Sequence, residues 1–217
     1  MGEEEVKKIL ATLEPFAPKG DSKDIYVRRG AYKEEHGWHF PSLEPLKKIR
    51  DSVPGSYYGS ERGPVLSIGC GLGFVESLLQ KLGVNVIPTD PFLSHGQEEL
   101  RKDWTCLWNY EAHTTIRIMT ASQAIEAHPE AKVFLFCWPS YNPDPDWPGE
   151  AMEMIVSRMD ENTRVIHIGE DEGGCTGSQK FFDLLNQNFS MEDSSWGKNF
   201  HGLHDYTQVW GPKDPED

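Results

Sequence analysis

The stretch from Val65 to Phe74 (VLSIGCGLGF) constrains the fold of this chain more than any other. Four mostly apolar residues lead into three glycines at alternate positions, and a helical pattern follows. A second apolar run, Val84 to Thr89, then ends at Asp90. A buried strand, a glycine-rich turn, a helix and a second strand tipped by an acid form the first βαβ unit of a parallel α/β sheet. The sequence therefore predicts a ligand site at the carboxyl edge of that sheet.

The spacing of the glycines discriminates between ligands. Dinucleotide-binding turns need the pattern G-x-G-x-x-G, in which the third glycine lets the helix pack closely beside the pyrophosphate. Counted from Gly69, that third position is Phe74, and the pattern present is instead Gly69, Gly71 and Gly73. Such a turn can offer backbone N–H groups to a carboxylate or a ribose. The spacing therefore disfavours an NAD-type oxidoreductase.

Asp90 lies 17 positions after Gly73, the reach expected of a carboxylate that accepts both hydroxyls of a ribose. Strand, turn, helix, strand and acid together resemble the class I S-adenosylmethionine (SAM)-dependent methyltransferases. The alternative is an ordinary α/β turn followed by an incidental aspartate. The resemblance implies that SAM is the cofactor.

Four further segments resemble a small, poorly characterised branch of methyltransferase-like proteins. They are Trp38-His39-Phe40-Pro41 (Trp-x-x-Pro), Cys137-Trp138-Pro139-Ser140-Tyr141, Gly169 to Gly177 (GEDEGGCTG) and His204-Asp205-Tyr206. The resemblance spans residues 26–210. It implies a Rossmann-like class I methyltransferase fold of α/β class. We expect a mostly parallel seven-stranded sheet with a C-terminal antiparallel hairpin, and an N-terminal aromatic lid from Tyr26 to Pro41.

The resemblance also implies which residues bind the cofactor. The glycines would shape the methionine side of the pocket, Asp90 would hold the ribose, and the residues after Asp90 and at the next strand end would border the adenine. The complete predicted set is Gly69, Cys70, Gly71, Gly73, Phe74, Asp90, Pro91, Phe92, Thr120, Ala121 and Cys137.

The loop after the fourth strand resembles the Asn/Asp-Pro-Pro-Tyr loop of amino-group methyltransferases. It departs from that loop at Trp138, whose indole cannot accept a hydrogen bond from an amine. An adenine or cytosine amino methyltransferase is therefore disfavoured. A flat ring can instead stack on a planar substrate or attract a cation, unless the loop only packs. The predicted substrate-binding residues are Trp38, His39, Trp138, Tyr141 and Glu170.

Two segments supply candidate acids and bases. Three consecutive acids follow the fifth strand, and Glu170, nearest the strand, is the favoured proton acceptor, although such acids also solvate loops or cap helices. His204 with Asp205 forms a candidate general-base pair, although such a cluster also satisfies a turn. Tyr141 completes the predicted catalytic set. No H-x-x-x-H or H-E-x-x-H spacing occurs, so no metal site is predicted.

The periodicity of apolar residues gives the expected elements. Helices are expected at 3–13, 43–53, 74–82, 97–108, 122–127 with Ser122 as its cap, 150–158 and 179–186. Strands are expected at 65–68, 84–89, 115–119, 133–137, 165–168, 191–196 and 205–210. Residues 21–41 are aromatic-rich, and we expect them to be irregular.

Composition is consistent with one compact domain of 217 residues, with N-terminal helices and a lid at 1–60 and the SAM-binding part at 61–217. No apolar run approaches a membrane span, no secretion signal begins the chain, and four scattered cysteines fit a reduced cytoplasmic protein. The net charge of −14 disfavours binding to nucleic acid phosphates. We therefore expect a small-molecule substrate, either cationic or aromatic. A Lys or Arg side chain of a protein substrate, which an acidic pocket would also suit, is the alternative.

Three function classes remain open at this point. The first is a SAM-dependent methyltransferase that moves a methyl group to N or O of a small molecule by in-line displacement. The second is a SAM-binding regulator or a catalytically degenerate relative, since such a protein would also retain the glycines and Asp90. The third, least favoured, is the NAD-type oxidoreductase.

Overall fold

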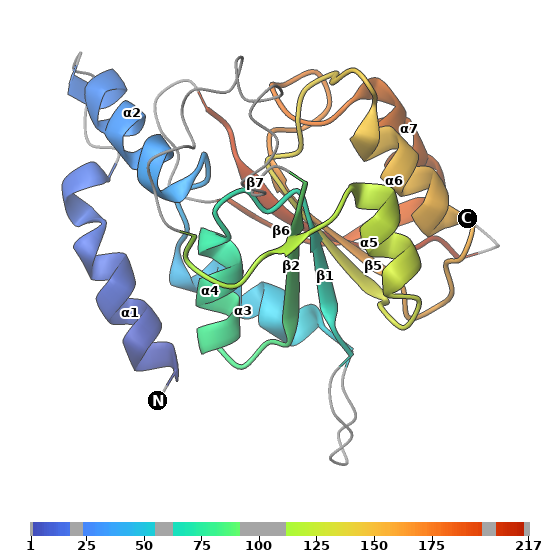
Figure 1. Ribbon diagram of the computed structural model, residues 1–217, viewed down its shortest axis with the longest axis horizontal. Coiled ribbons are helices and arrows are strands. Elements are labelled where there is room, and N and C mark those ends of the chain that lie inside the picture. The colour runs from blue at the N-terminus through green and yellow to red at the C-terminus, as the bar shows by residue number, and fades with distance from the viewer. Residues whose placement is uncertain (1, 18–23, 55–62, 92–111, 197–202, 215–217) are drawn as a thin grey trace.

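A computed structural model of the chain describes residues 2–17, 24–54, 63–91, 112–196 and 203–214. It shows one central β-sheet with helices packed on both faces (Figure 1). The strands are β1 (Val65–Ile68), β2 (Val86–Asp90), β3 (Arg117–Ile118), β4 (Val133–Cys137), β5 (Arg164–Gly169), β6 (Phe189–Trp196) and β7 (Tyr206–Pro212).

The seven strands follow the order β3-β2-β1-β4-β5-β7-β6. The neighbours among the first five are all parallel. The last two strands form an antiparallel pair, and β7 also runs antiparallel to β5. The expected fold, a mostly parallel seven-stranded α/β sheet that ends in an antiparallel hairpin, is confirmed.

Helices cover the two faces in two groups (Figure 1). The first group is α1 (Gly2–Thr12), the 3₁₀ helix η1 (Glu14–Phe16), α2 (Asp24–His36), α3 (Leu43–Ser52) and α4 (Phe74–Lys81). The second group is α5 (Ala121–Ala127), α6 (Trp147–Val156) and α7 (Gln179–Asn188). Among the described residues, no helix is both long enough and apolar enough to cross a membrane.

Each group of helices shares a hydrophobic cluster with one face of the sheet. Val6 of α1, Ile49 of α3 and Leu78 of α4 belong to the same buried cluster as Leu135 of β4. Residues of α5, α6 and α7 pack against the other face, among them Phe181. Because α1 to α3 bury side chains in the core of the sheet, the N-terminal segment is a layer of the domain.

The N-terminal segment differs from our expectation in one respect. Residues 21–41 were expected to be irregular, and this is wrong for α2, which runs from Asp24 to His36. Tyr32 and His36 lie one helical turn apart on the same face, and the ring of Tyr32 contacts Phe16 and Phe40. Tyr32 is completely buried. Burial by distant aromatic residues therefore stabilises a helix that local sequence preference does not predict.

The remaining elements agree with the sequence to within a few residues, apart from one cap and one end. Thr120, not Ser122, caps α5, and its hydroxyl accepts from the N–H of Gln123 at 3.3 Å. Helix α6 begins three residues earlier than expected, because Asp146 caps it and accepts from Gly149 N–H at 3.0 Å. The helix expected at 97–108 lies outside the described residues.

Candidate functional site

The glycine turn joins the carboxyl end of β1 to the start of α4. Gly69, Gly71 and Gly73 all have positive φ, at 69°, 57° and 71°, which glycine adopts without the steric penalty of a side chain. The N–H of Gly71 donates to Oδ2 of Asp90 at 2.9 Å. Asp90 is the last residue of β2, the neighbour of β1, and is 7% exposed. The predicted turn and the predicted acid are therefore in direct contact.

Side chains could not replace two of these glycines without clashes. A Cβ on Gly69 would lie 2.8 Å from the ring of Trp147, and one on Gly73 would lie 2.8 Å from Cγ2 of Thr114. Nothing described lies within 4 Å of the same position on Gly71. The turn is thus tightly packed at both ends and open in the middle, beside Asp90. This arrangement fits the ribose and methionine portions of SAM, which need backbone donors and a carboxylate.

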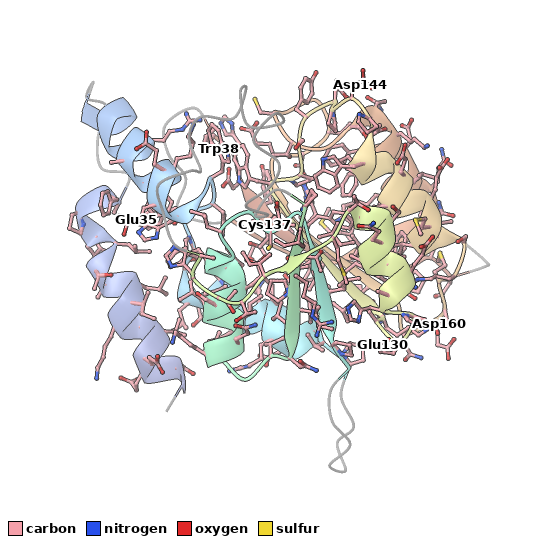
Figure 2. The ribbon with its side chains drawn as sticks, in the orientation of Figure 1. Glu35, Trp38, Glu130, Cys137, Asp144 and Asp160 are labelled. Carbon is pink, nitrogen blue, oxygen red and sulfur yellow. The ribbon has the colours of Figure 1, made fainter. Side chains whose placement is uncertain are left out.

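The other predicted cofactor residues that the structure describes stand in or next to the turn, after Asp90, at the end of β4 and at the start of α5. Cys70 lies within the turn. Phe74 begins α4, and the centroid of its ring lies 4.5 Å from the ring centroid of His36. Pro91 follows Asp90 directly, whereas Phe92 lies outside the described residues. Cys137 ends β4 near the centre of the sheet (Figure 2), and burial raises the pKa of its thiol well above the ordinary value.

Thr120 and Ala121 stand at the start of α5, beyond the end of β3. Because β3 pairs with β2 through Asp90 and Ile118, these two residues lie at the same sheet edge as Asp90. The hydroxyl of Thr120 is part of the capping box with Gln123. Thr120 is exposed, and its hydroxyl keeps its own hydrogen as a donor while it accepts from Gln123.

The loop after β4 has a strained residue at its first position. Trp138 has a φ of 53°, a left-handed conformation that is rare for a bulky residue, and its N–H donates to the carbonyl of Ile168 at 2.7 Å. Its indole N–H donates to Oδ2 of Asp205 at 3.0 Å. Strained backbone that its surroundings hold in place is frequent at functional sites. The ring of Trp138 is therefore held in one orientation beside the sheet edge.

Trp38, labelled in Figure 2, stacks on Trp138. The two ring centroids are 5.2 Å apart and the planes differ by 15°. Two cations of α2 contact the Trp38 ring, with the Arg29 guanidinium carbon 5.0 Å and Lys33 Nζ 4.3 Å from its centroid. Trp38 remains 38% exposed. The N-terminal segment thus places an accessible aromatic ring, flanked by positive charge, over the loop after β4.

His39 and Asp205 form a buried pair behind this stack. His39 Nδ1 lies 3.3 Å from Oδ2 of Asp205, and the hydroxyl of Tyr32 donates to the backbone carbonyl of His39 at 2.7 Å. We expected Asp205 to act with His204. The structure places Asp205 against His39 and Trp138, and it places His204 beside Glu170, with His204 Nδ1 and Glu170 Oε1 3.9 Å apart.

Glu170 binds two loops with its carboxylate. Oε2 accepts from the N–H of Cys175 at 2.7 Å, and Oε1 accepts from the N–H of His204 at 3.0 Å. Burial raises the pKa of Glu170, but these two backbone donors outweigh it, so its pKa lies below the ordinary value. A carboxylate with a lowered pKa is a weak base, and this one holds the loops after β5 and before β7 together.

A cleft of about 700 Å³ opens beside these loops. It lies at the carboxyl end of β5, where Tyr141 from the loop after β4 faces the acidic loop and Tyr206. Tyr141 is 59% exposed. The lining is acidic, with the carboxylates of Glu170, Asp171 and Glu172. No group of His, Cys, Asp and Glu among the described residues could hold a metal ion.

Sequence reasoning missed one buried acid of this region. Glu76, in the first turn of α4, is 1% exposed and accepts from the hydroxyl of Ser67 at 2.6 Å. A signal was present, because Glu76 stands three residues before Leu79, in phase with the apolar face of α4. An acid on such a face calls for a functional explanation.

Comparison with known proteins gives similarities of fold at low sequence identity. No protein-family model matches the chain, and no curated protein matches it. The 1,6-didemethyltoxoflavin-N1-methyltransferase of Burkholderia thailandensis, crystallised with 1,6-didemethyltoxoflavin and S-adenosylhomocysteine, is 16% identical over 91% of this chain and 93% of its own, with a TM-score of 0.47.

Two other solved structures have similar values. A TehB-like SAM-dependent methyltransferase from Corynebacterium glutamicum is 15% identical over 88% of this chain and 97% of its own, with a TM-score of 0.47. The PH0226 protein of Pyrococcus horikoshii OT3 is 15% identical over 92% and 96%, with a TM-score of 0.45. At such low values, the assignment of the fold rests on the sheet topology itself.

Proposed function

We propose that this protein is a SAM-dependent methyltransferase that transfers a methyl group to N or O of a small molecule. The observation that carries the proposal is the contact between the N–H of Gly71 and the carboxylate of Asp90, at the adjacent carboxyl ends of β1 and β2. Ligands of open parallel sheets bind beyond these ends, and an acid at the end of the second strand suits a ribose. No described atom lies within 4 Å of a Cβ placed on Gly71, which leaves room for such a ligand.

SAM supplies an electrophilic methyl group, and in-line transfer needs mainly alignment of the acceptor and exclusion of water. Asp205 fixes the indole of Trp138 through a hydrogen bond, and the protein thereby offers a rigid flat surface to an acceptor. Tyr141 borders the neighbouring cleft. In this proposal Glu170 orients the loops that bear Cys175 and His204. The chain needs no strong base if the acceptor is a neutral amine.

The chemistry of the cleft supports a cationic or aromatic small molecule as the substrate. Its carboxylates attract positive charge, and Tyr141 and Tyr206 offer rings for stacking or cation–π contact. The net charge of −14 disfavours a nucleic acid substrate. In this proposal residues 1–60 form the N-terminal helices and a lid, and Trp38 and His39 contact the substrate. The protein would act in the cytoplasm.

A SAM-binding regulator without transfer activity is the second candidate. One observation favours it, because the two acids expected to act in catalysis use their carboxylates on the protein's own groups. Glu170 accepts from two backbone N–H groups, and Asp205 accepts from Trp138 and contacts His39. A panel of small amines and phenols, assayed for formation of S-adenosylhomocysteine, separates the two candidates. Turnover of any member above the rate without acceptor excludes the regulator.

Calorimetric titration of the purified protein with SAM, S-adenosylhomocysteine and NADH tests the cofactor. We expect micromolar binding of the first two and none of NADH. Asp90→Ala should weaken SAM binding about tenfold or more, since it removes a charge-assisted hydrogen bond. Asp193→Asn, which changes an exposed acid of β6, is the control and should leave the affinity unchanged. Unchanged affinity in Asp90→Ala, or wild-type protein that ignores SAM, would contradict the proposal.

A further inference from the structure

Glu76 is a fully enclosed acid directly behind the glycine turn. It stands three residues after Gly73, in the first turn of α4, and its Oε1 accepts from Ser67 of β1 at 2.6 Å. Both residues are almost completely buried, at 1% and 0% exposure. The side chain therefore reaches from α4 to the strand whose end leads into the glycine turn.

The surroundings of Glu76 contain no compensating positive charge among the described residues. The side chains that shift its pKa are Ser67 on β1 and Asp90 on β2, and Glu76 in turn raises the pKa of Cys70 in the glycine turn and of Cys137 on β4. Asp90 is a second acid, so it disfavours the charged form of Glu76. Burial, with Asp90 as a smaller cause, raises the pKa of Glu76 to about 7, although the Ser67 hydroxyl and the backbone N–H of Glu76 itself lower it.

Packing alone does not account for this acid. The neighbouring positions Val75, Leu78 and Leu79 are apolar and buried, and a further apolar residue would complete the same face. An uncompensated buried carboxyl destabilises the fold. Strongly perturbed acids of this kind concentrate at ligand sites, where a bound group supplies the missing charge.

We propose that Glu76 supplies the negative charge that stabilises the cationic methionine portion of SAM behind the glycine turn. The inference rests on the proposed function and deepens it, since it assigns the methionine side of the same site. Asp90 at the end of β2 serves the ribose side, and Glu76 beside β1 serves the charged side. Ser67 is a positioning residue, because its hydroxyl fixes one oxygen of the Glu76 carboxyl.

The proposal has a direct consequence for protons. A carboxyl whose pKa lies near 7 is partly protonated in the free protein at neutral pH. A cation brought close to it favours the carboxylate, lowers the pKa and releases the proton. Binding of SAM at pH 7 should therefore release a fraction of a proton, and the affinity should rise as the pH increases through 7.

Three related ligands separate the parts of the site. SAM has an ammonium and a sulfonium, S-adenosylhomocysteine keeps only the ammonium, and 5′-methylthioadenosine lacks the amino acid and has neither. Glu76→Gln keeps the shape of the side chain and removes the charge. We expect this variant to bind SAM about tenfold or more weakly. Its affinity for 5′-methylthioadenosine should stay within about twofold of wild type, since the lost interaction concerns only the cation.

The outcomes distinguish this inference from the proposed function. If wild type binds none of the three ligands, both fail. If wild type binds all three and Glu76→Gln weakens none, or weakens SAM and 5′-methylthioadenosine equally, the role of Glu76 is overturned while the cofactor assignment stands. S-adenosylhomocysteine identifies the cation, since weakening of SAM alone indicates the sulfonium, and weakening of both indicates the ammonium.

Proton release can be measured on wild-type protein alone, so the test does not depend on the folding of a variant. At pH 7 the binding heat measured in phosphate differs from that in Tris by the number of protons released multiplied by the difference between the ionisation enthalpies of the two buffers. We expect release with SAM and none with 5′-methylthioadenosine. Equal heats for SAM in the two buffers would overturn the inference, as would proton release that persists unchanged in a folded Glu76→Gln variant.

Discussion

His39 and Asp205 are 166 positions apart in the chain, yet His39 Nδ1 lies 3.3 Å from Oδ2 of Asp205 and both side chains are almost fully buried. The same carboxylate oxygen accepts from the indole of Trp138. One acid therefore connects the segment before α3, the loop after β4 and the start of β7. Described aromatic residues of these three segments, among them Trp38, Trp138 and Tyr206, lie near the proposed substrate site.

Removal of this acid should destabilise the protein. Asp205→Ala leaves the buried donor of Trp138 and the ring of His39 without their shared partner, and we expect a loss of about 2–4 kcal/mol in the free energy of unfolding. Urea unfolding followed by tryptophan fluorescence measures this loss. Asp193→Ala removes an exposed ion pair with Lys48 and should cost less than about 1 kcal/mol. Equal losses in the two variants would contradict a special role for Asp205.

The glycine turn allows a matched pair of substitutions. Gly69→Ala places a methyl group 2.8 Å from the ring of Trp147 in addition to straining a positive φ, so it should lower stability by about 3 kcal/mol. Gly71→Ala strains φ alone, at about 1–2 kcal/mol, because no described atom lies within 4 Å of its Cβ.

Gly71→Ala, which should lower stability less than Gly69→Ala does, should lower the affinity for SAM more. The methyl group of Gly71→Ala would enter the space beside Asp90, and we expect loss of SAM binding out of proportion to the small loss of stability. Thermal unfolding and calorimetry, performed on the same samples, give both quantities. Full SAM affinity in a folded Gly71→Ala variant would show that the ligand does not use this space.

Two buried groups, Glu76 and His167, should change the free energy of unfolding in opposite directions as the pH rises. The pKa of Glu76 is raised from 4.5 to about 7, so its contribution falls as the pH rises from 4.5 to 7. Burial lowers the pKa of His167 from 6.5 to about 4, although the Gln208 side chain opposes the shift, so its contribution is present above 6.5 and is lost as the pH falls towards 4. Each amounts to about 3 kcal/mol over its window.

Because the two windows overlap between pH 4.5 and 6.5, wild-type stability should show little net slope there from these groups. Glu76→Gln should leave a stability that rises with pH, and His167→Gln should leave one that falls. Urea unfolding at several pH values between 4.5 and 7 measures the slopes. The same slope in wild type and in both variants would show that neither group titrates in this range.

Glu170 should protect backbone amides in two loops from hydrogen exchange. Glu170→Ala removes the acceptor of the Cys175 and His204 N–H groups, and we expect the exchange of these two amide hydrogens to accelerate about tenfold or more. The amide of Phe181, which donates to the hydroxyl of Ser178 at 3.1 Å, is an internal control. Unchanged exchange at Cys175 and His204 would show that other contacts hold these loops.

The sequence predicted the sheet because its strands are short, apolar and separated by turn residues. Strands such as Val133–Cys137 are buried on both faces and read as unbroken apolar runs. Asp90 could be chosen in advance because the glycine turn and the acid at the end of the next strand are linked by a local βαβ geometry. Their contact in the structure depends on that unit alone.

Other features could not be predicted, because they depend on residues far apart in the chain. Helix α2 forms where Tyr32 packs against Phe16 and Phe40, and its local sequence gives little sign of it. Asp205 contacts His39 and Trp138, which are distant in sequence, whereas the sequence suggested its neighbour His204. Tertiary contacts of this kind override local preference and sequence proximity.

The position of β7 has a consequence for how the protein is made. This strand lies between β5 and β6, and it carries the residues that follow Asp205. A ribosome synthesises it after the other six strands that the structure describes, so the nascent chain exposes an unpaired edge of β5 until this strand is inserted. His39 and Trp138 gain their contact with Asp205 only after β7 is inserted. The proposed substrate site would thus be completed only when β7 joins the sheet.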